Sequence, residues 1–410
     1  MTLIKSISGI RGIIGTSLDL KIIKKYVAAF SSISPEGIII LARDTRNSGE
    51  NFISHSTALF NEVNRPSINC GIIPTPTAQL LIEKNNYAGG IVFTASHNPS
   101  NWNGMKFINS KGIFINHKEF NELENKTNKI VLKKDSVAIS TEDCSNESIN
   151  SHIDSIMSLD IIDEEKIKNK KFKVAIDCTN GATSKALPSL LKKLNCEIVK
   201  INSTFSEEFG RSPEPIPENL IDLSELVINS NADIGLATDP DGDRLSIVDN
   251  KGRPLGEELT LSLAIYYYLK YSPESRSNPI VTNLSTTRLT EYITKKFDTP
   301  FLRTAVGEIN VVNEMLKSDS LLGGEGNGGV IYRKSHLGRD SLVGTTMILN
   351  LLANENKTIS DVRNFFPHYY IEKSSITLEL DNLDISNVIK KYFKDKIISE
   401  IDGIKIELDN

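Results

Sequence analysis

Short apolar runs alternate with helix-like stretches along this chain, and a polar loop follows several of these runs. Gly37–Ala42 (GIIILA) precedes the loop RDTRNSG, and Lys173–Asp177 (KVAID) precedes the loop CTNGA. Apolar runs bounded by turn residues are typical of buried strands. Strands that alternate with helices predict α/β units built on largely parallel sheets. Ligands bind at the carboxyl ends of the strands in such sheets, so these polar loops are candidate site segments.

The same reading predicts the remaining elements. We expect further strands at Gly90–Thr94, Glu197–Ile201, Ala232–Ala237, Leu245–Asp249, Pro279–Asn283 and Val330–Tyr332, helices at Thr183–Leu194 and Thr287–Phe297, and a final strand, helix and strand at Ser375–Leu380, Ile385–Lys396 and Ile404–Leu408.

A length of 410 residues predicts several domains. Residues 126–170 are polar and charge-rich apart from Ser151–Ile162, and residues 251–256 (KGRPLG) are rich in turn formers. A third junction is expected around Pro367–Ser375. We therefore expect domains at 1–149, 150–253, 254–370 and 371–410.

The composition excludes some classes of protein. A net charge of −5 argues against a general nucleic-acid binder. The four cysteines are scattered and form no CxxC pair, which is typical of reduced thiols and not of a disulfide framework or a zinc site. No signal-peptide pattern or membrane-length apolar run is present. We expect a cytoplasmic monomer or homodimer that acts without a membrane or nucleic acid.

A serine follows one of the expected strands. Thr94–Phe107 reads TASHNPSNWNGMKF, and Ser96 stands close to His97, Asn98 and Lys106, which are polar groups able to contact a phosphate. A lone loop serine is more often a cap or turn residue. No GxSxG elbow surrounds it, so an acyl-transfer triad is not expected. Ser96 is instead a candidate carrier of a phosphoryl group.

Three carboxylates alternate in a second loop, DPDGDR. Asp239, Asp241 and Asp243 would repel each other unless a cation or protons intervene. Oxygen ligands of this kind suit Mg²⁺. An EF-hand is excluded because Arg244 occupies the sixth loop position and Asn250 the twelfth. The alternative is an exposed acidic turn; Arg244, an anion-binding fork, favours a site.

Two glycine-rich segments complete the motifs. Ser8–Gly15 (SGIRGIIG) places Arg11 between glycines, either as a tight turn or as a backbone that approaches an anion closely. Gly324–Gly329 (GEGNGG) matches a dinucleotide fingerprint formally, but a strand-like segment follows it and no acid stands at the required distance. The alternative is a plain glycine-rich hairpin. Glu325 and Asn327 in this segment suit hydrogen bonds to sugar hydroxyls.

Together these segments resemble the α-D-phosphohexomutase family over nearly the whole chain. The resemblance implies that Ser96 is phosphorylated, that Ser96 and the three aspartates bind one Mg²⁺, and that Arg11, His97 and Arg244 act beside the phosphoserine. It also implies Lys106 as a general acid or base, and Glu325, Asn327, Gly307 and Arg339 as substrate-binding residues.

The resemblance further implies a fold and a mechanism. The fold would comprise three related mixed-sheet α/β domains around a cleft and an incomplete C-terminal α+β domain. The phosphoserine would give its phosphoryl group to a hexose phosphate, and the resulting bisphosphate would reorient and return its other phosphate to Ser96. A hexose bisphosphate would serve as activator.

The substrate is less constrained. Family members often have GExSGH where this chain has Asn327 and Gly329, and the variant GEGNGG together with VGEINV and GRD resembles phosphoglucosamine mutases. Glucosamine 6-phosphate is therefore the expected substrate; glucose and mannose phosphates are the alternative, and a phosphatase or a non-catalytic relative are others. The usual distal-phosphate loop with Thr-Glu-Pro is not seen before Asn410, so weak activity is expected.

Overall fold

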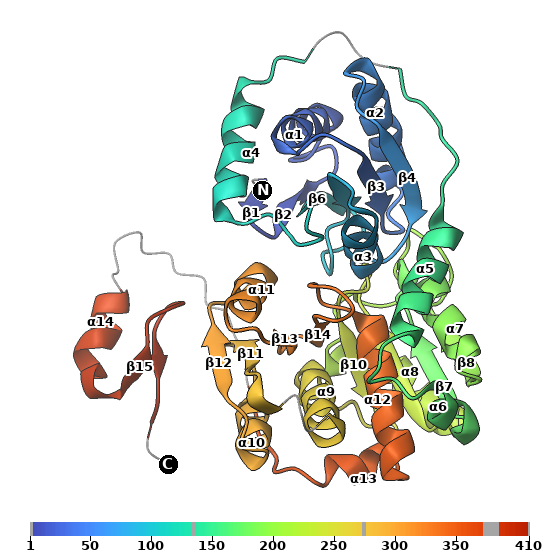
Figure 1. The fold of residues 1–410 in the computed structure, drawn as a ribbon, viewed down its shortest axis with the longest axis vertical. Helices are drawn as coiled ribbons and strands as arrows, with labels where there is room; N and C mark the ends of the chain where they lie inside the picture. The colour runs from blue at the N-terminus through green and yellow to red at the C-terminus, as the bar shows by residue number, and fades with distance from the viewer. Residues whose placement is uncertain (1–2, 133–136, 273–275, 372–384, 409–410) are drawn as a thin grey trace.

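The structure is a computed structural model that describes residues 3–132, 137–272, 276–371 and 385–408. Figure 1 shows three α/β units, with the first at the top, the second at the lower right and the third below the first, and a small C-terminal unit at the left. Within these described ranges no helix has the length and apolar character needed to cross a membrane.

The first unit is built on a six-stranded sheet with strand order β1-β2-β6-β5-β3-β4. Strands β3, β4 and β5 are mutually parallel, whereas β6, β2 and β1 continue the sheet through antiparallel pairs. Its elements are β1 (Ile4–Ser6), β2 (Gly9–Ile13), α1 (Leu20–Ile33), β3 (Ile39–Arg43), α2 (Ser48–Glu62), β4 (Ser67–Ile72), α3 (Thr75–Asn85), β5 (Gly89–Phe93), β6 (Trp102–Asn109) and α4 (His117–Lys129).

Strand β3 shows why its sequence is apolar throughout. Ile39 and Leu41 pack in the cluster that includes α1 and α2, whereas Ile40 and Ala42 pack in the cluster that includes α3. Alternate side chains of a strand point to opposite faces, and both faces of this sheet are covered by helices.

The second unit is a four-stranded mixed sheet with order β10-β9-β7-β8, in which β10 is antiparallel. Two helices, α5 and α6, lead into it. Its elements are α5 (Ser145–Met157), α6 (Glu164–Lys170), β7 (Lys173–Asp177), α7 (Thr183–Lys193), β8 (Glu197–Ile201), α8 (Ile221–Ser230), β9 (Ile234–Thr238) and β10 (Leu245–Val248). The domain boundary expected after residue 149 falls within α5.

The third unit repeats this plan with order β12-β11-β13-β14, and its last strand is again antiparallel. Its elements are α9 (Glu257–Tyr271), β11 (Ile280–Asn283), α10 (Arg288–Lys296), β12 (Phe301–Thr304), α11 (Glu308–Lys317), β13 (Leu322–Glu325), β14 (Gly329–Tyr332), α12 (Ser341–Glu355) and α13 (Ile359–Arg363).

The C-terminal unit contains α14 (Ile385–Tyr392), a 3-10 turn at Lys394–Lys396, and the strand pair β15 (Ile397–Ser399) and β16 (Lys405–Ile406). Helix α14 and the 3-10 turn lie within the helix expected at Ile385–Lys396, and β16 lies within the strand expected at Ile404–Leu408, whereas β15 was not predicted. The strand expected at Ser375–Leu380 lies outside the described residues. Three mixed-sheet α/β units and a small C-terminal unit with strands confirm the predicted fold class.

One local expectation was wrong, and one of two alternatives is excluded. The residues after Ser96 do not all form a loop, because Asn103, Gly104 and Lys106 lie in β6. Arg11 lies in β2 and not in a turn. Gly104 pairs with Arg11 across the sheet, and a Cβ at Gly104 would meet Ile10 O at 2.2 Å. Glycine is therefore needed at Gly104 because β2 and β6 approach each other closely.

Buried groups join the units. The largest apolar cluster includes Val92 of β5, Leu236 of β9 and Leu322 of β13, so one core runs through all three sheets. A polar junction lies beside it: Asp340 Oδ2 is 2.8 Å from His152 Nε2 and 3.1 Å from His336 Nε2. All three of these side chains are buried.

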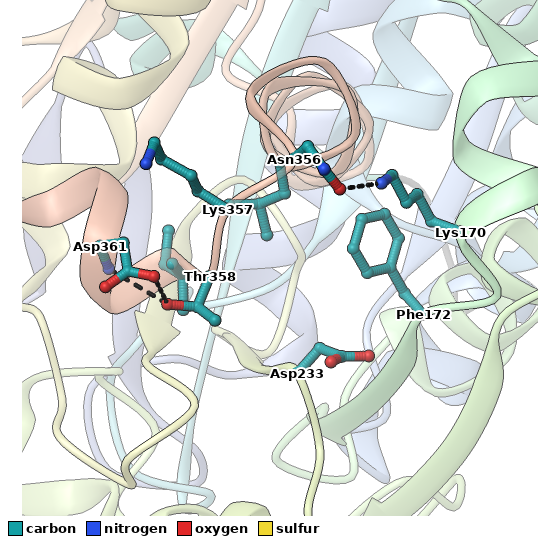
Figure 2. Close-up of a pocket in the computed structure, with 9 residues that line it drawn as sticks. Lys170, Phe172, Asp233, Asn356, Lys357, Thr358 and Asp361 are labelled. Atoms are coloured by element: carbon teal, nitrogen blue, oxygen red, sulfur yellow. Dashed lines mark hydrogen bonds between the residues drawn. The ribbon is translucent and has the colours of Figure 1, made fainter.

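A pocket of about 400 Å³ also lies between the second and third units, at the ends of α6 and α12 (Figure 2). Lys170 donates a hydrogen bond to Asn356, and on the opposite wall the Thr358 hydroxyl donates a hydrogen bond to the Asp361 carboxylate. Two lysines and two aspartates are among its lining residues, and none of the predicted site residues is among them.

Candidate active site

Ser96 lies directly after β5, in the loop at the carboxyl end of that strand. Its side chain is 1% exposed, and its Oγ donates a 3.0 Å hydrogen bond to Asp239 Oδ2. Its φ of +49° lies in the left-handed region, where a residue with a Cβ is strained. Such strain is held by the surrounding structure and clusters at functional sites.

Neighbouring strand ends hold this conformation. Ser96 N donates to Thr94 Oγ1 at 2.9 Å, and Thr94 Oγ1 donates to Asp44 Oδ2 at 2.6 Å. Arg46 is 1% exposed, pairs with Asp44, and donates to Ser96 O at 2.9 Å. The loop after β3 thus supports the loop after β5, as expected for loops at one edge of a parallel sheet.

The acidic loop follows β9 of the second unit. Asp239, Asp241 and Asp243 are each 0% exposed, and each offers a ligand atom within 4.8 Å of the others. An exposed acidic turn is thereby excluded. The loop backbone is fixed from both neighbouring units, because Thr75 N donates to Asp241 O at 2.8 Å and Ser341 Oγ donates to Gly242 O at 2.7 Å.

The pKa values of the three carboxyls are shifted in different directions. Burial, reinforced by the charges of Asp243 and Asp241, raises the pKa of Asp239 well above its usual range. Burial also opposes ionisation of Asp241, but Lys106 outweighs it and lowers that pKa. Burial is outweighed at Asp243 too, where Arg339 and Lys106 lower the pKa.

The donor set fits a divalent cation. Asp241 Oδ1 and Asp243 Oδ1 are buried without a hydrogen-bond partner, and Arg244 Nε stands 3.8 Å from the latter. An unsatisfied buried carboxylate oxygen is costly, and a hard cation is the partner that such oxygens favour. The loop is therefore able to hold a metal ion.

Lys106 comes to the same place from β6 of the first unit. Its Nζ lies 2.5 Å from Asp241 Oδ2 and 2.8 Å from Asp243 Oδ2, and its side chain is 3% exposed. Burial disfavours the ammonium, but the two carboxylates outweigh burial and raise the pKa of Lys106. Lys106 is thus held in its protonated form.

Arg339 of the third unit ties together carboxylates from two units. Its guanidinium donates to Glu308 Oε2 at 2.8 Å, Glu325 Oε2 at 2.7 Å and Asp243 Oδ2 at 2.6 Å. Burial disfavours its charge, but Asp243 and the two glutamates raise the pKa of Arg339 well above its ordinary value. A planar fork suits such multiple pairing better than a point charge would.

The GEGNGG segment forms a tight hairpin between β13 and β14, as the glycine-rich alternative anticipated. Glu325 ends β13, and its Oε1 accepts hydrogen bonds from Asn283 Nδ2 at 2.7 Å and Gly307 N at 2.9 Å. Asn327 Oδ1 is buried without a hydrogen-bond partner. Glu325 is thus already hydrogen-bonded within the protein, whereas Asn327 offers an unused acceptor.

His97 and two arginines complete the predicted set. Arg11 donates to Asn98 Oδ1 at 3.3 Å, and Arg244 donates to Glu214 Oε1 at 3.0 Å. Burial, aided by the charges of Arg244 and Arg11, lowers the pKa of His97 to about 3. The imidazole is therefore neutral near pH 7.

A cavity of about 170 Å³ collects most of these groups. It is lined by seven of the predicted site residues, namely Arg11, Lys106, Arg244, Gly307, Glu325, Asn327 and Arg339. Segments from all three units thus converge on one polar cavity beside the acidic loop.

Sequence reasoning missed several supporting residues. Glu308 lines the cavity and is 6% exposed, and burial raises the pKa of its carboxyl against the pull of Arg339. Thr75 Oγ1 donates to Asp241 Oδ2 at 2.6 Å. Asp44 and Arg46 were visible only as members of a polar loop at a strand end, and nothing in the sequence marked Thr75.

Comparison with known proteins identifies the family of this chain. Family models for phosphoglucomutase/phosphomannomutase α/β/α domains I, II and III match residues 3–134, 150–252 and 256–369. A phosphoglucomutase/phosphomannomutase of Thermococcus kodakarensis is 32% identical over 424 residues, covering 98% of this chain and 89% of that protein. A phosphoglucosamine/phosphogalactosamine mutase of Sulfurisphaera tokodaii is 30% identical over 410 residues, covering 97% and 89%.

A solved structure confirms the fold. A phosphoglucomutase/phosphomannomutase family protein of Burkholderia thailandensis superposes with a TM-score of 0.81 at 23% identity, covering 99% of this chain and 90% of that one. With three matched domains and relatives that align over most of both chains, the chain belongs to the α-D-phosphohexomutase family and is a phosphohexomutase.

Proposed function

We propose that this enzyme interconverts glucosamine 6-phosphate and glucosamine 1-phosphate through a phosphoserine at Ser96. The observation that carries the proposal is the 3.0 Å hydrogen bond from Ser96 Oγ to Asp239 Oδ2, which places a hydroxyl at the edge of a carboxylate triad. A phosphoryl group on Ser96 would bring about −1.5 to −2 charges beside this triad. A bound cation would offset the repulsion between these negative charges.

Asp239, Asp241 and Asp243 would hold Mg²⁺ together with an oxygen of phosphorylated Ser96. The ion would neutralise the charge on the transferring phosphoryl group. The unpartnered oxygens of Asp241 and Asp243 support this assignment.

The transfer exchanges one P–O bond for another. The bond from phosphorus to Ser96 Oγ breaks while a bond forms from phosphorus to a sugar hydroxyl oxygen. The sugar hydroxyl gives up its proton to solvent, and Ser96 Oγ leaves as an alkoxide that takes up one proton, so the number of protons is conserved. Lys106 is protonated and buried beside the triad, so it suits the acid role in this direction. Arg11 and Arg244 would offset phosphate charge from the cavity side.

The cavity also supports an amino sugar as substrate. Two carboxylates, Glu308 and Glu325, line it together with Asn327, whose Oδ1 lacks a hydrogen-bond partner. An ammonium group at C2 could donate a hydrogen bond to Asn327 Oδ1, while the two glutamates, which already accept hydrogen bonds from Arg339, add negative charge nearby. Relatives named phosphoglucosamine mutase favour the same substrate, whereas the Thermococcus relative keeps glucose and mannose phosphates as the alternative.

A side-by-side mutase assay tests this function. Glucosamine, glucose and mannose 6-phosphates are each supplied with a catalytic amount of the matching bisphosphate as activator. The proposal expects the highest kcat/KM for glucosamine 6-phosphate. Equal or reversed ratios would assign the enzyme to glucose and mannose phosphates, and release of inorganic phosphate without isomerisation would make it a phosphatase.

A further inference from the structure

Two cysteines that are far apart in the sequence meet in the fold. Cys70 on β4 and Cys144 immediately before α5 have their Sγ atoms 3.8 Å apart. The backbone keeps them together, because Cys144 N donates to Asn69 O at 3.1 Å. A disulfide bond requires about 2 Å between the sulfurs, and side-chain rotation from a starting distance of 3.8 Å can supply the difference.

Cys144 has the environment of a reactive thiol. It precedes the first residue of a 13-residue helix, and helix N-termini stabilise thiolates. The hydrogen-bond contact between the Cys70 and Cys144 sulfurs, with a further contribution from Ser148, lowers the pKa of Cys144 to about 6. The same contact raises the pKa of Cys70, which is 1% exposed. One sulfur is thus the nucleophile and the other is a buried thiol beside it.

A cavity gives reagents access to Cys144. It measures about 410 Å³, and Cys144 lines it together with Glu142, Asp143 and Glu147. Three carboxylates at this opening favour a cationic reagent over an anionic one. The cavity is separate from the site around Ser96, since the two share no lining residue.

We propose that Cys70 and Cys144 form a redox-active dithiol that a small cationic disulfide oxidises to an intramolecular disulfide. This inference does not depend on the proposed substrate. The disulfide bond would link β4, an edge strand of the first sheet, to the segment that leads into α5.

The chemistry consists of two thiol–disulfide exchanges. The Cys144 thiolate attacks one sulfur of the reagent RSSR, forming a mixed disulfide and releasing RS⁻. Cys70 Sγ then attacks Cys144 Sγ and displaces the second RS⁻, while the released thiolate takes up the Cys70 proton. The protein loses two electrons and two protons, and one RSSR becomes two RSH.

The test uses the full chain, reduced and then treated with cystamine at about pH 6. Acid quenching, digestion without reductant and mass spectrometry should recover one peptide pair joined through Cys70 and Cys144, with Cys178 and Cys196 still reduced. The cross-link closes a loop of 74 positions and should raise the Tm by a few degrees.

Three variants separate the steps. Cys70→Ala should accumulate the mixed disulfide on Cys144, and its Cys144 should react on the order of tenfold more slowly at pH 6 because the hydrogen bond that lowers the pKa is lost. Cys144→Ser, at a half-buried position, should abolish both products. Cys196→Ser, which removes another partly buried thiol, should still form the cross-link.

Either of two results would overturn the proposal. One is a stable mixed disulfide at Cys144 in the unsubstituted protein, since a thiol at 3.8 Å should resolve it. The other is a cross-link through Cys178 or Cys196, which would mean that the folded chain does not direct the reaction.

Discussion

Ser96 Oγ lies 3.0 Å from Asp239 Oδ2, and this hydrogen bond joins residues that are 143 positions apart in the chain. Each follows a central parallel strand of its own sheet, β5 in the first unit and β9 in the second. The site around them therefore exists only when the loops at the carboxyl ends of these two strands meet.

Ser96→Ala should lower mutase kcat by at least about a thousandfold, because no other hydroxyl would carry the phosphoryl group. Ser100→Ala is the matched control, since Ser100 is exposed in the same loop and should retain activity. Phosphopeptide analysis of the unsubstituted enzyme should locate phosphate on Ser96. Near-normal turnover of the Ser96→Ala enzyme would contradict the assignment.

Asp241→Asn should cut activity at least about a hundredfold while the fold persists, because the change removes a ligand charge and also relieves repulsion among the aspartates. Mg²⁺ should raise the Tm of the unsubstituted protein through preferential binding to the folded state and should not raise that of the variant. Asp222→Asn, on the exposed side of α8, should behave like the unsubstituted protein. An equal Mg²⁺-dependent shift in both variants would place the ion elsewhere.

Arg339→Met should destabilise the protein by about 3–5 kcal/mol, because Glu308, Glu325 and Asp243 would lose a buried cation. The control is Arg333→Met, which removes an exposed pair with Asp319 and should cost only about 0–1 kcal/mol. Chemical denaturation followed by fluorescence compares the two. Similar losses for both variants would show that the buried pairs contribute little.

Acid should unfold the protein partly through Asp340. Burial opposes its ionisation, but His152 and His336 outweigh burial and hold the pKa of Asp340 below its ordinary value. The stabilisation is therefore present above the unfolded-state pKa of about 3.9 and is lost as pH falls through the lower folded-state value.

Tm measured from about pH 6 to about pH 3 should show this effect. Asp340→Asn should have a lower Tm at the upper end and a shallower decline toward acid. Asp222→Asn is the control here too, because removing an exposed carboxylate should leave the decline of Tm toward acid pH unchanged. If Tm falls with pH equally steeply in Asp340→Asn and in the unsubstituted protein, Asp340 does not contribute to acid unfolding.

Much of the fold was predictable because the local pattern and the tertiary environment agree. Lys173–Asp177 and Glu197–Ile201 form strands with the expected bounds, since their apolar residues face covered sheet surfaces. Strand β6 was missed because Trp102–Gly104 reads as a continuation of the polar loop. Its strand character comes from pairing with β2 and β5, which no local pattern reports.

Without the family resemblance, residues of the candidate site could be predicted only where several chemically active groups occur in one segment. The alternating aspartates predict a cation site because their charges would otherwise repel one another, and all three are buried in the structure. Glu308, Thr75 and the nearness of Cys70 to Cys144 depend on how separate elements pack. A single residue of common type carries no such information before the chain has folded.

Hydrogen bonds to the backbone of the acidic loop restrict how the three units can move relative to one another. Thr75 of the first unit and Ser341 of the third each donate a hydrogen bond to this loop of the second unit, so a movement of either unit away from the second would break one of these bonds. If a sugar bisphosphate reorients during turnover, separation of the first unit from the second is a costly way to make room for it, because that separation would break the hydrogen bond from Thr75 to the acidic loop.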